Sequence, residues 1–382
     1  MILQNTAFNF QLSAFSFQLL AFVYPASSLH LSPVSQDELF MQRALELANL
    51  GAGIVSPNPR VGCVIVHEEK IIGEGWHKKY GEAHAEVNAI ASVVDKRLLP
   101  KSTVYVNLEP CSHQGKTPPC ADLLLKHSVK KVVIANLDTN PLVAGNGIRK
   151  LREGGMEVIT GVSQKEGRAL NKRFFTFIER KRPYILLKWA ETSDGFIAHE
   201  NFESKWISSD YSRQLAHRWR TEEDAVLVGT RTARHDDPKL NVREWSGRNP
   251  VRVVLDRFLR LSNKLNLFDH SQPTLCYNLL RHEEHENLTL VRLGDENFWQ
   301  EMIHDLYHRN IQSVMVEGGG QTLETFIKGG WWDEARIFRS HRTFTKGIPA
   351  PILKGRLIYE GILKDDHLSI FINENPAENS RL

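Results

Sequence analysis

The spacing of hydrophobic residues divides the first half of the chain into alternating helices and short strands. Apolar residues recur with a helical period over 37–50, between a capping box of Ser35 and Glu38 and a stop at Gly51. Short apolar runs over 61–66 and 71–74 predict a pair of strands. The other expected elements are a helix over 84–94, a strand over 104–108, a helix over 120–126, a strand over 132–135, a helix over 147–153 and a strand over 157–160. This alternation predicts a three-layer α/β/α domain around a mainly parallel or mixed sheet.

A charged segment that ends in proline separates this pattern from a second one. Residues 179–182 read Glu-Arg-Lys-Arg and precede Pro183, after which a strand pattern starts at once. The elements expected beyond it are strands over 184–189, 225–228, 251–255, 274–277 and 313–316, with helices around 209–220 and 298–309. We therefore predict an α/β protein with an extension over 1–35 and two domains over 36–180 and 183–382.

The extension differs from the rest of the chain in composition, because the first 36 residues contain no Lys, Arg, Asp or Glu. The apolar run over 19–24 resembles part of a secretory signal, but no positive charge precedes it and it is too short to span a bilayer. We expect a disordered or wrongly assigned extension, and export stays open as the alternative. Mass spectrometry of the native N-terminus tests this expectation.

Composition narrows the partners and the compartment. A net charge of +3 in 382 residues provides no basic face for nucleic acid, and no apolar segment is long enough for a membrane span. Cys63 and Cys276 lie in apolar runs and are expected to be buried strand residues. The other two cysteines are better used as thiolate ligands, which need reducing conditions, so we expect a cytoplasmic protein.

Four residues with zinc chemistry follow one another along the chain. His84, Cys111 and Cys120 supply one imidazole and two thiolates. Three protein ligands leave the fourth position of a tetrahedral zinc ion to water, whose pKa falls toward neutrality, so that hydroxide forms at ordinary pH. The His-x-Glu and Pro-Cys pattern resembles the zinc-dependent deaminases, in which a glutamate stays off the metal and moves protons. That resemblance makes Glu86 the general acid and base.

The spacing of the two cysteines resembles one family within this group. Nucleobase deaminases usually carry Cys-x-x-Cys, whereas residues 112–119 separate Cys111 from Cys120 here. This insert, the Pro-Asn-Pro turn over 57–59 and the segment 138–145 resemble the bifunctional riboflavin-biosynthesis deaminase/reductase. The resemblance implies a cytidine-deaminase-like domain that hydrolytically deaminates 2,5-diamino-6-(5-phosphoribosylamino)pyrimidin-4-one. It also implies that the substrate contacts Asn58, His77, His113 and Lys116.

A glycine-rich turn in the second half predicts an anion site. Residues 314–323 read as a strand, a turn with Gly318, Gly319 and Gly320, and the start of a helix. Such a turn lets a phosphate approach the free amides of the helix N-terminus. Because Leu323 replaces the third glycine of the dinucleotide fingerprint, the turn alone is also consistent with a tight connection that binds nothing.

The second half resembles the reductase domain of the same family, which has a dihydrofolate-reductase-like α/β fold. The resemblance implies NADPH reduction of the ribosyl group to ribityl, with Lys188 and Asp236 moving protons. The residues implied to hold the cofactor are Ala190, Trp206, Thr232, Asp236, Gly319, Gly320, Gln321, Thr322, Leu323, Glu324 and Thr325. Those implied to line the substrate site are Ser204, Arg220, Leu240, Arg243 and Glu317, and arginine suits a phosphate.

Two segments, 193–196 and 340–347, depart from the family pattern without removing a residue assigned to chemistry. They leave open a second hypothesis, a deaminase whose reductase-like half serves only for binding or oligomerisation. A third hypothesis, a nucleic-acid-editing deaminase, predicts Cys-x-x-Cys spacing and a basic patch, and the sequence has neither. The family resemblance further implies a homo-oligomer.

Overall fold

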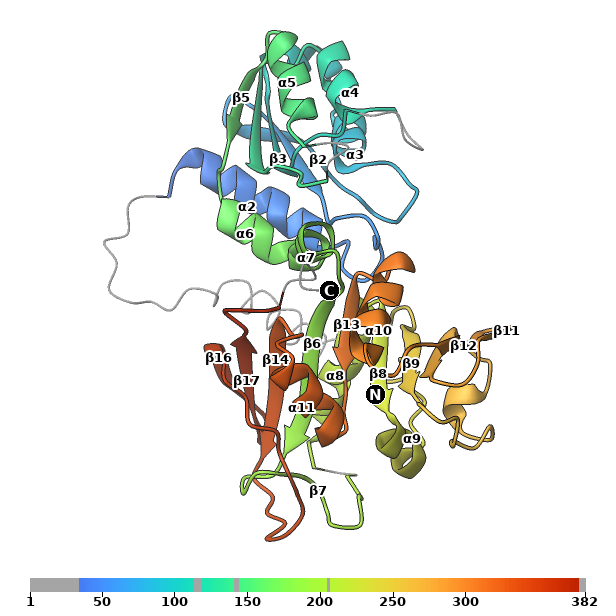
Figure 1. Ribbon diagram of the computed structural model, residues 1–382. Coiled ribbons are helices and arrows are strands. Elements are labelled where there is room, and N and C mark those ends of the chain that lie inside the picture. The colour runs from blue at the N-terminus through green and yellow to red at the C-terminus, as the bar shows by residue number, and fades with distance from the viewer. Residues whose placement is uncertain (1–33, 113–117, 141–143, 205–206, 378–382) are drawn as a thin grey trace.

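The sheet of the N-terminal domain has five strands in the order β2-β1-β3-β4-β5, with β1 antiparallel to its neighbours and β3, β4 and β5 parallel (Figure 1). The computed structural model describes residues 34–112, 118–140, 144–204 and 207–377. The elements of this domain are α2 (Gln36–Asn49), β1 (Gly62–His67), β2 (Lys70–Trp76), α3 (Ala85–Ser92), the 3-10 helix η1 (Lys96–Lys101), β3 (Thr103–Leu108), α4 (Cys120–Lys126), β4 (Lys131–Asn136), α5 (Asn146–Glu153), β5 (Glu157–Thr160), α6 (Gln164–Leu170) and α7 (Lys172–Arg180).

Helices cover both faces of this sheet. On one face, Met41 of α2 and Leu170 of α6 pack against strand residues such as Val64. On the other face, α3, α4 and α5 pack against Ile65 and Val104. The predicted three-layer α/β/α arrangement is therefore confirmed.

Two local predictions in this domain differ from the structure. The helix expected over 84–94 is α3, which ends at Ser92 because Val93 has an extended backbone with ψ of 125°. His84 is the N-cap of this helix rather than a residue of its first turn. Helices α6 and α7 were not expected, whereas the capping box of Ser35 and Glu38 is present as predicted.

The C-terminal domain has a ten-stranded sheet in the order β11-β12-β10-β9-β8-β13-β6-β14-β17-β16, and a small sheet of β15 and β7. The strands from β12 to β14 are parallel, and the edge strands β11, β17 and β16 are antiparallel. The elements are β6 (Tyr184–Glu191), β7 (Phe196–Ala198), α8 (Asp210–Glu222), β8 (Ala225–Gly229), α9 (Thr230–Asp236), β9 (Val251–Leu255), the 3-10 helix η2 (Asn266–Phe268), β10 (Thr274–Asn278), β11 (Glu283–His285), β12 (Leu288–Arg292), α10 (Phe298–His308), β13 (Ser313–Val316), α11 (Gly320–Lys328), β14 (Glu334–Ser340), β15 (Ile348–Pro349), β16 (Arg356–Leu363) and β17 (Asp366–Ile372).

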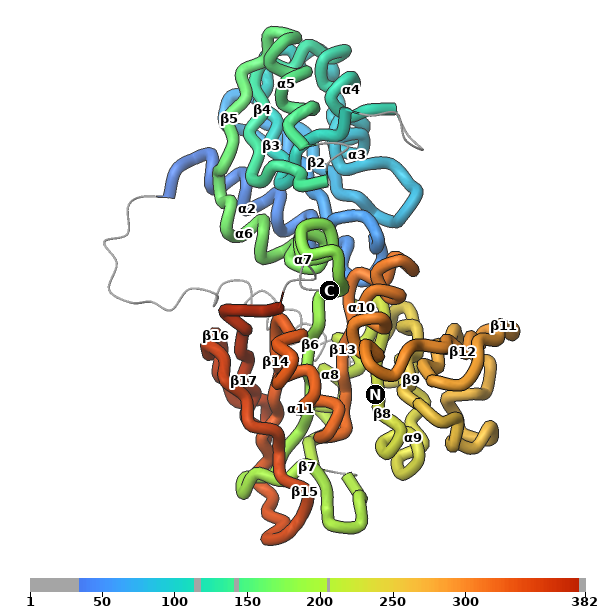
Figure 2. The backbone as a smooth tube through the Cα atoms, in the orientation of Figure 1, coloured from blue at the N-terminus to red at the C-terminus, as the bar shows by residue number. Residues whose placement is uncertain are grey.

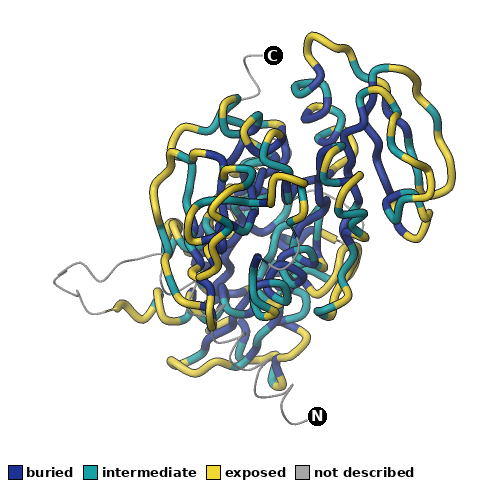
Figure 3. The backbone as a smooth tube through the Cα atoms, turned by 90° about the horizontal axis from the view of Figure 1, so that it is seen from below, coloured by how far each residue is buried: buried dark blue, intermediate teal, exposed yellow. Residues whose placement is uncertain are grey.

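This larger sheet is also covered on both faces. Trp219 of α8 and Ala233 of α9 belong to the core on one face, and Met302 of α10 and Phe326 of α11 to the core on the other. The tube in Figure 2 follows the chain from α7 into β6, which lies inside this sheet rather than at its edge. Figure 3 shows that the buried residues lie mainly in the interior and the exposed residues mainly at the periphery.

Buried ion pairs join the two domains beside α7. The guanidinium of Arg173 pairs with the fully buried carboxylate of Glu223, and Lys172 pairs with Glu334, which also accepts a hydrogen bond from Arg336. Breaking such a pair would leave an unpaired charge in a low-dielectric region. These ion pairs therefore hold α7 against the C-terminal domain.

Three sequence predictions concern residues outside the active sites. Cys63 in β1 and Cys276 in β10 are fully buried, as expected. The predicted extension over 1–35 lies outside the described residues except for Val34 and Ser35. No helix among the residues with a described structure has the length and apolar character of a membrane span.

Candidate active sites

The three predicted zinc ligands converge from three elements of the N-terminal domain. His84 caps α3, Cys111 follows β3, and Cys120 opens α4. Their ligand atoms all lie within 4.8 Å of one another. The Nδ1 atom of His84 lies 3.6 Å from the Sγ of Cys111 and 3.3 Å from the Sγ of Cys120.

The chemistry of these donors fits a zinc ion. The backbone N–H of Cys120 donates a hydrogen bond of 3.3 Å to the Sγ of Cys111. Hydrogen bonding from the Cys120 side chain, followed by that from His84, lowers the pKa of Cys111 to about 4 against the opposing effect of burial. A thiolate is the form of cysteine that binds metal. One imidazole and two thiols are also a known catalytic ligand set, with a fourth position left for another ligand.

Glu86 lies in the first turn of α3 and is only 3% exposed. It is not part of the group of ligand atoms formed by the two cysteines and the histidine. Burial raises the pKa of Glu86, and the nearby Cys111 thiolate raises it further. A carboxyl group with a raised pKa exchanges a proton more readily near neutral pH, which suits a general acid and base.

Two of the predicted substrate residues lie beside the metal ligands. The Nδ2 atom of Asn58 lies 3.1 Å from the Nε2 of His77, whose Nδ1 lies 3.1 Å from the carbonyl oxygen of Ala83. The ring of His77 also meets that of His84 edge to face, with centroids 5.5 Å apart. Burial lowers the pKa of His77, so its neutral form is favoured. The other two predicted residues, His113 and Lys116, lie outside the described residues.

Glu109 has a structural role that the sequence did not reveal. Its buried carboxylate accepts hydrogen bonds from the backbone N–H groups of four residues in the segment 138–148. One of these donors is Gly147, where an added Cβ would lie 2.0 Å from the carbonyl oxygen of Pro110. Glu109 therefore ties this segment to the Pro110-Cys111 turn. Its only sequence signal is an acid between an apolar strand and Pro-Cys.

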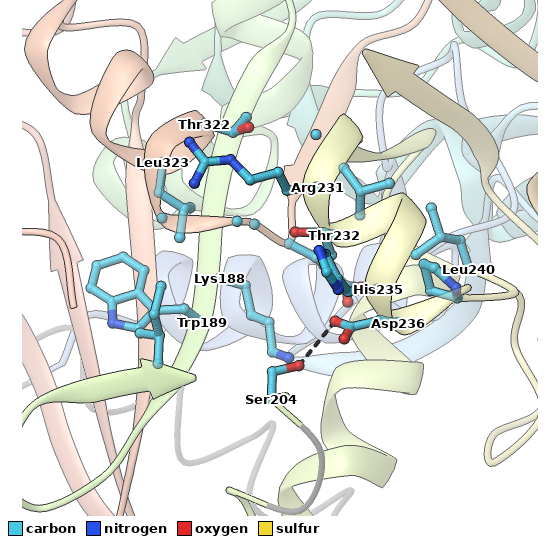
Figure 4. A pocket seen from close by; sticks show the side chains of 18 of the residues that line it. Lys188, Trp189, Ser204, Arg231, Thr232, His235, Asp236, Leu240, Thr322 and Leu323 are labelled. Carbon is cyan, nitrogen blue, oxygen red and sulfur yellow. Dashed lines mark hydrogen bonds between the residues drawn. The ribbon is translucent and has the colours of Figure 1, made fainter. Parts of the chain in front are cut away.

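The C-terminal domain contains a cavity of about 1140 Å³ (Figure 4). Most of the predicted cofactor and substrate residues line it, from β6, α8, α9, α11 and the segments that connect these elements to their neighbours. These lining residues are Lys188, Ala190, Ser204, Arg220, Thr232, Asp236, Leu240, Arg243, Glu317, Gly319, Gly320, Gln321, Thr322, Leu323 and Thr325. Glu324 is not among them and instead pairs with Lys328 at 3.1 Å, while Trp206 lies outside the described residues.

A buried ion pair organises the charge in this cavity. The Nε of Arg220 lies 2.6 Å from one carboxylate oxygen of Glu317, and its Nη2 lies 2.7 Å from the other. Burial acts to raise the pKa of Glu317, but the charge and hydrogen bonds of Arg220, with the charge of Lys188, outweigh it and lower this pKa to about 2. Burial also lowers the pKa of Lys188, so its ammonium group gives up a proton more easily than an exposed lysine does.

Asp236 and Ser204 face each other across the cavity wall. The Oγ of Ser204 donates a hydrogen bond of 2.9 Å to the Oδ2 of Asp236 (Figure 4). Figure 4 also shows the amino group of Lys188 near this pair. A proton donor and a carboxylate on one wall provide the groups that a reduction with proton transfer needs.

The glycine turn after β13 brings backbone close to the cavity. Gly318 has φ of +121°, which side chains with a Cβ rarely adopt. Helix α11 begins at Gly320 without a side-chain hydrogen bond at its cap. Its N-terminal amides therefore suit the phosphates of a dinucleotide.

His217 was not predicted and also lines this cavity. Burial, followed by the charges of Arg220 and Arg243, lowers its pKa to about 3, so the ring is neutral at ordinary pH. No motif surrounds it in the sequence, so only the fold places it here.

The two segments that depart from the family pattern contact each other. The carboxylate of Asp194 accepts hydrogen bonds from the backbone N–H groups of Phe344 and Thr345, and β7 pairs with β15. The two departures from the family's sequence pattern thus lie in segments that contact each other.

Comparisons with known proteins agree with this geometry. Residues 34–136 match the family model described as cytidine and deoxycytidylate deaminase zinc-binding region, and residues 183–340 match the RibD C-terminal domain. A riboflavin biosynthesis protein RibD of Aquifex aeolicus is 41% identical over 333 residues, which cover 85% of this chain and 93% of that protein. The RibD protein of Escherichia coli is 36% identical and covers 79% and 87%.

Solved structures show the same two-domain fold. The diaminohydroxyphosphoribosylaminopyrimidine deaminase/5-amino-6-(5-phosphoribosylamino)uracil reductase of Thermotoga maritima matches with a TM-score of 0.81 and 38% identity, over 88% of this chain and 98% of that one. Acinetobacter baumannii RibD matches with the same TM-score and 33% identity, over the same shares of both chains. The chain has a zinc-binding deaminase domain and a reductase domain that uses NADPH, and it belongs to the RibD family of bifunctional riboflavin-biosynthesis proteins.

Proposed function

We propose that this chain catalyses the two reactions named for its Thermotoga maritima relative, each at one of the sites described above. The first removes the ring amine of 2,5-diamino-6-(5-phosphoribosylamino)pyrimidin-4-one, and the second reduces the ribosyl group of the resulting aminouracil to ribityl. The observation that carries the proposal is the convergence of His84, Cys111 and Cys120 with Glu86 buried outside their ligand group.

In the deamination, His84, Cys111 and Cys120 would hold the zinc ion, which would supply an activated water molecule for attack on the ring carbon that bears the amine. Glu86 would accept one proton from this water and pass it to the ring nitrogen. It would then take the remaining proton of the attacking hydroxyl group and give it to the amine, which leaves as ammonia. Asn58 and His77 position the pyrimidine, and His113 and Lys116 are proposed from the family resemblance to hold the same substrate. The raised pKa of Glu86 supports its role in both directions of proton transfer.

In the reduction, the cavity residues would hold NADPH, which would supply a hydride for the first carbon of the opened ribose, and the enzyme would supply the proton. Lys188 and Asp236 move this proton, since burial lowers the lysine pKa and Ser204 hydrogen bonds to the carboxylate. The residues proposed for the cofactor are Ala190, Trp206, Thr232, Asp236, the segment 319–323 and Thr325; Glu324 is left out because it does not line the cavity. Those proposed for the substrate are Ser204, Arg220, Leu240, Arg243 and Glu317.

The enzyme is further proposed to act in the cytoplasm as a homo-oligomer, without nucleic acid or membrane as a partner. Thiolate ligands favour a reducing compartment, and a net charge of +3 favours no polyanion. Light scattering of the purified protein measures the oligomeric state, and fractionation of the cell measures the compartment.

The two activities are tested together in one reaction. The zinc-loaded protein is incubated with the diaminopyrimidinone substrate and NADPH, while ammonia release and nicotinamide absorbance are followed. We expect ammonia and a loss of absorbance. Ammonia alone would instead support the alternative in which the reductase-like half only binds, and would direct attention to the departures at 193–196 and 340–347.

A further inference from the structure

A loop of the deaminase domain, residues 53–60, lies directly against the reductase domain. The Oγ of Ser56 donates a hydrogen bond of 2.9 Å to the Oδ2 of Asp224, which follows α8. The Nε2 of Gln312, just before β13, donates a hydrogen bond of 2.7 Å to the carbonyl oxygen of Pro57. Asn58, the next residue of this 53–60 loop, is proposed above to contact the pyrimidine.

The reductase side of this contact is held in place. Asp224 and Gln312 are 8% and 6% exposed. The carboxylate of Asp224 also accepts hydrogen bonds from the backbone N–H of Gln312, at 2.8 Å, and from Arg248, at 2.5 Å. The backbone N–H of Asp224 donates a hydrogen bond of 3.0 Å to the Oγ of Ser313. The ends of α8 and β13 thus form one hydrogen-bonded unit.

The two backbones also approach closely at the start of the 53–60 loop. A Cβ added at Gly53 would lie 2.3 Å from the carbonyl oxygen of Thr221 in α8. The remaining space at this junction has a volume of about 30 Å³, which is room for water but not for a ligand. The loop therefore packs closely against the reductase domain, with Val55 buried.

Asn58 connects the 53–60 loop to the deaminase site. The backbone N–H of Asn58 donates to the carbonyl oxygen of Val55 at 2.8 Å, which closes a tight turn. The Nδ2 of Asn58 lies 3.1 Å from the Nε2 of His77, and the ring of His77 meets the ring of the metal ligand His84. A shift of Pro57 would thus move Asn58 relative to the metal ligands.

We infer that the reductase domain sets the geometry of the deaminase substrate site, with Gln312 and Asp224 as positioning residues for deamination. This inference rests on the proposed function, because it takes Asn58 to be a substrate contact. It goes beyond two independent sites on one chain: the deaminase would be complete only with the reductase domain folded against it.

The test uses the full-length enzyme and Gln312→Ala, which removes the donor to Pro57. The KM for deamination is expected to rise about fivefold, since one hydrogen bond to the loop is lost, while kcat changes less. Reduction of a supplied aminouracil and the zinc content should stay at the wild-type level. Gln300→Ala, a glutamine on α10, is the matched control and should change neither activity.

A double variant decides whether the effect runs through Asn58. In an Asn58→Ala background, Gln312→Ala should raise the KM for deamination no further. An unchanged KM in Gln312→Ala, an equal loss of both activities, or full additivity with Asn58→Ala would each overturn the inference. Failure of the proposed function would show earlier and separately, as a wild-type enzyme that releases no ammonia.

Discussion

In the deaminase domain, the proposed ligands and acid come from residues 84–120, whereas the reductase cavity draws Lys188, Asp236 and Glu317 from distant parts of the chain. The residues of the deaminase site are positioned by the starts of two helices and by the turn that follows β3. Adjacent parallel strands position those of the reductase site, because β6, β13 and β8 are neighbours in the sheet. The deaminase site is thus encoded by one short stretch of sequence, whereas the reductase site depends on the order of strands in the sheet and on a buried ion pair.

The largest effect expected on either side of this comparison is that of Glu86→Gln. Glutamine keeps the size of the side chain but cannot shuttle a proton, so deamination should fall about 10³-fold. Ammonia release measures this, and zinc content serves as the control. Reduction of a supplied aminouracil should be unaffected, and equal loss of both activities would refute the separation of the two chemistries.

Glu317→Gln should act on stability as well as on reduction. It leaves the guanidinium of Arg220 buried without its carboxylate, which costs about 3 kcal/mol of unfolding free energy at neutral pH. Urea denaturation measures this cost. A variant as stable as wild type would show that the ion pair does not organise the cavity.

The loss of stability in Glu317→Gln should also depend on pH, in a direction that the pKa of Glu317 determines. Glu317 has its pKa lowered from 4.5 to about 2, so its stabilising contribution is complete above pH 4.5 and is lost as the pH falls toward 2. The stability gap between wild type and Glu317→Gln should therefore narrow over this interval. A gap that stays constant would mean that another group accounts for the loss.

Lys188→Met should reduce NADPH oxidation about 10²-fold while ammonia release continues, because it removes a proposed proton donor. Lys328→Met, at an exposed lysine of α11, is the matched control and should keep both activities. If the two variants behaved alike, the proton would have to come from Asp236 or water.

The smallest effect expected is that of Gly147→Ala. Its methyl group would displace the Pro110 carbonyl oxygen, which precedes Cys111, at a cost of about 1–3 kcal/mol. Zinc affinity, measured by competition with a chromophoric chelator, should fall while reduction stays unchanged. Wild-type affinity would show that the Cys111 turn tolerates movement.

The sequence predicted most where local signals agree. Helix α4 begins and ends as predicted. The zinc ligands converge as expected, because each lies at an element boundary: Cys111 and Cys120 each follow a proline, and His84 caps α3. Helix α9 is short and polar and was not predicted; only two of its residues, Thr232 and Asp236, were singled out, through the family resemblance.

What the sequence could not provide depends on distant contacts. Strand β17 pairs with both β14 and β16. Strand β16, at the edge of the sheet, is exposed or half-buried except for its last residue, so its pattern alone does not predict a strand. His217 and Glu109 likewise acquire their surroundings from segments far away in the chain. Local periodicity carries no information about such partners.

The difference in burial among the four cysteines has a practical consequence for studying this enzyme. Cys63, Cys120 and Cys276 are buried, and Cys111 is the one that solvent partly reaches. A thiol-reactive dye applied to the native protein should therefore label a single position, and bound metal should protect that position. Labelling stoichiometry would then report the fraction of molecules that carry zinc, without any substrate in the sample.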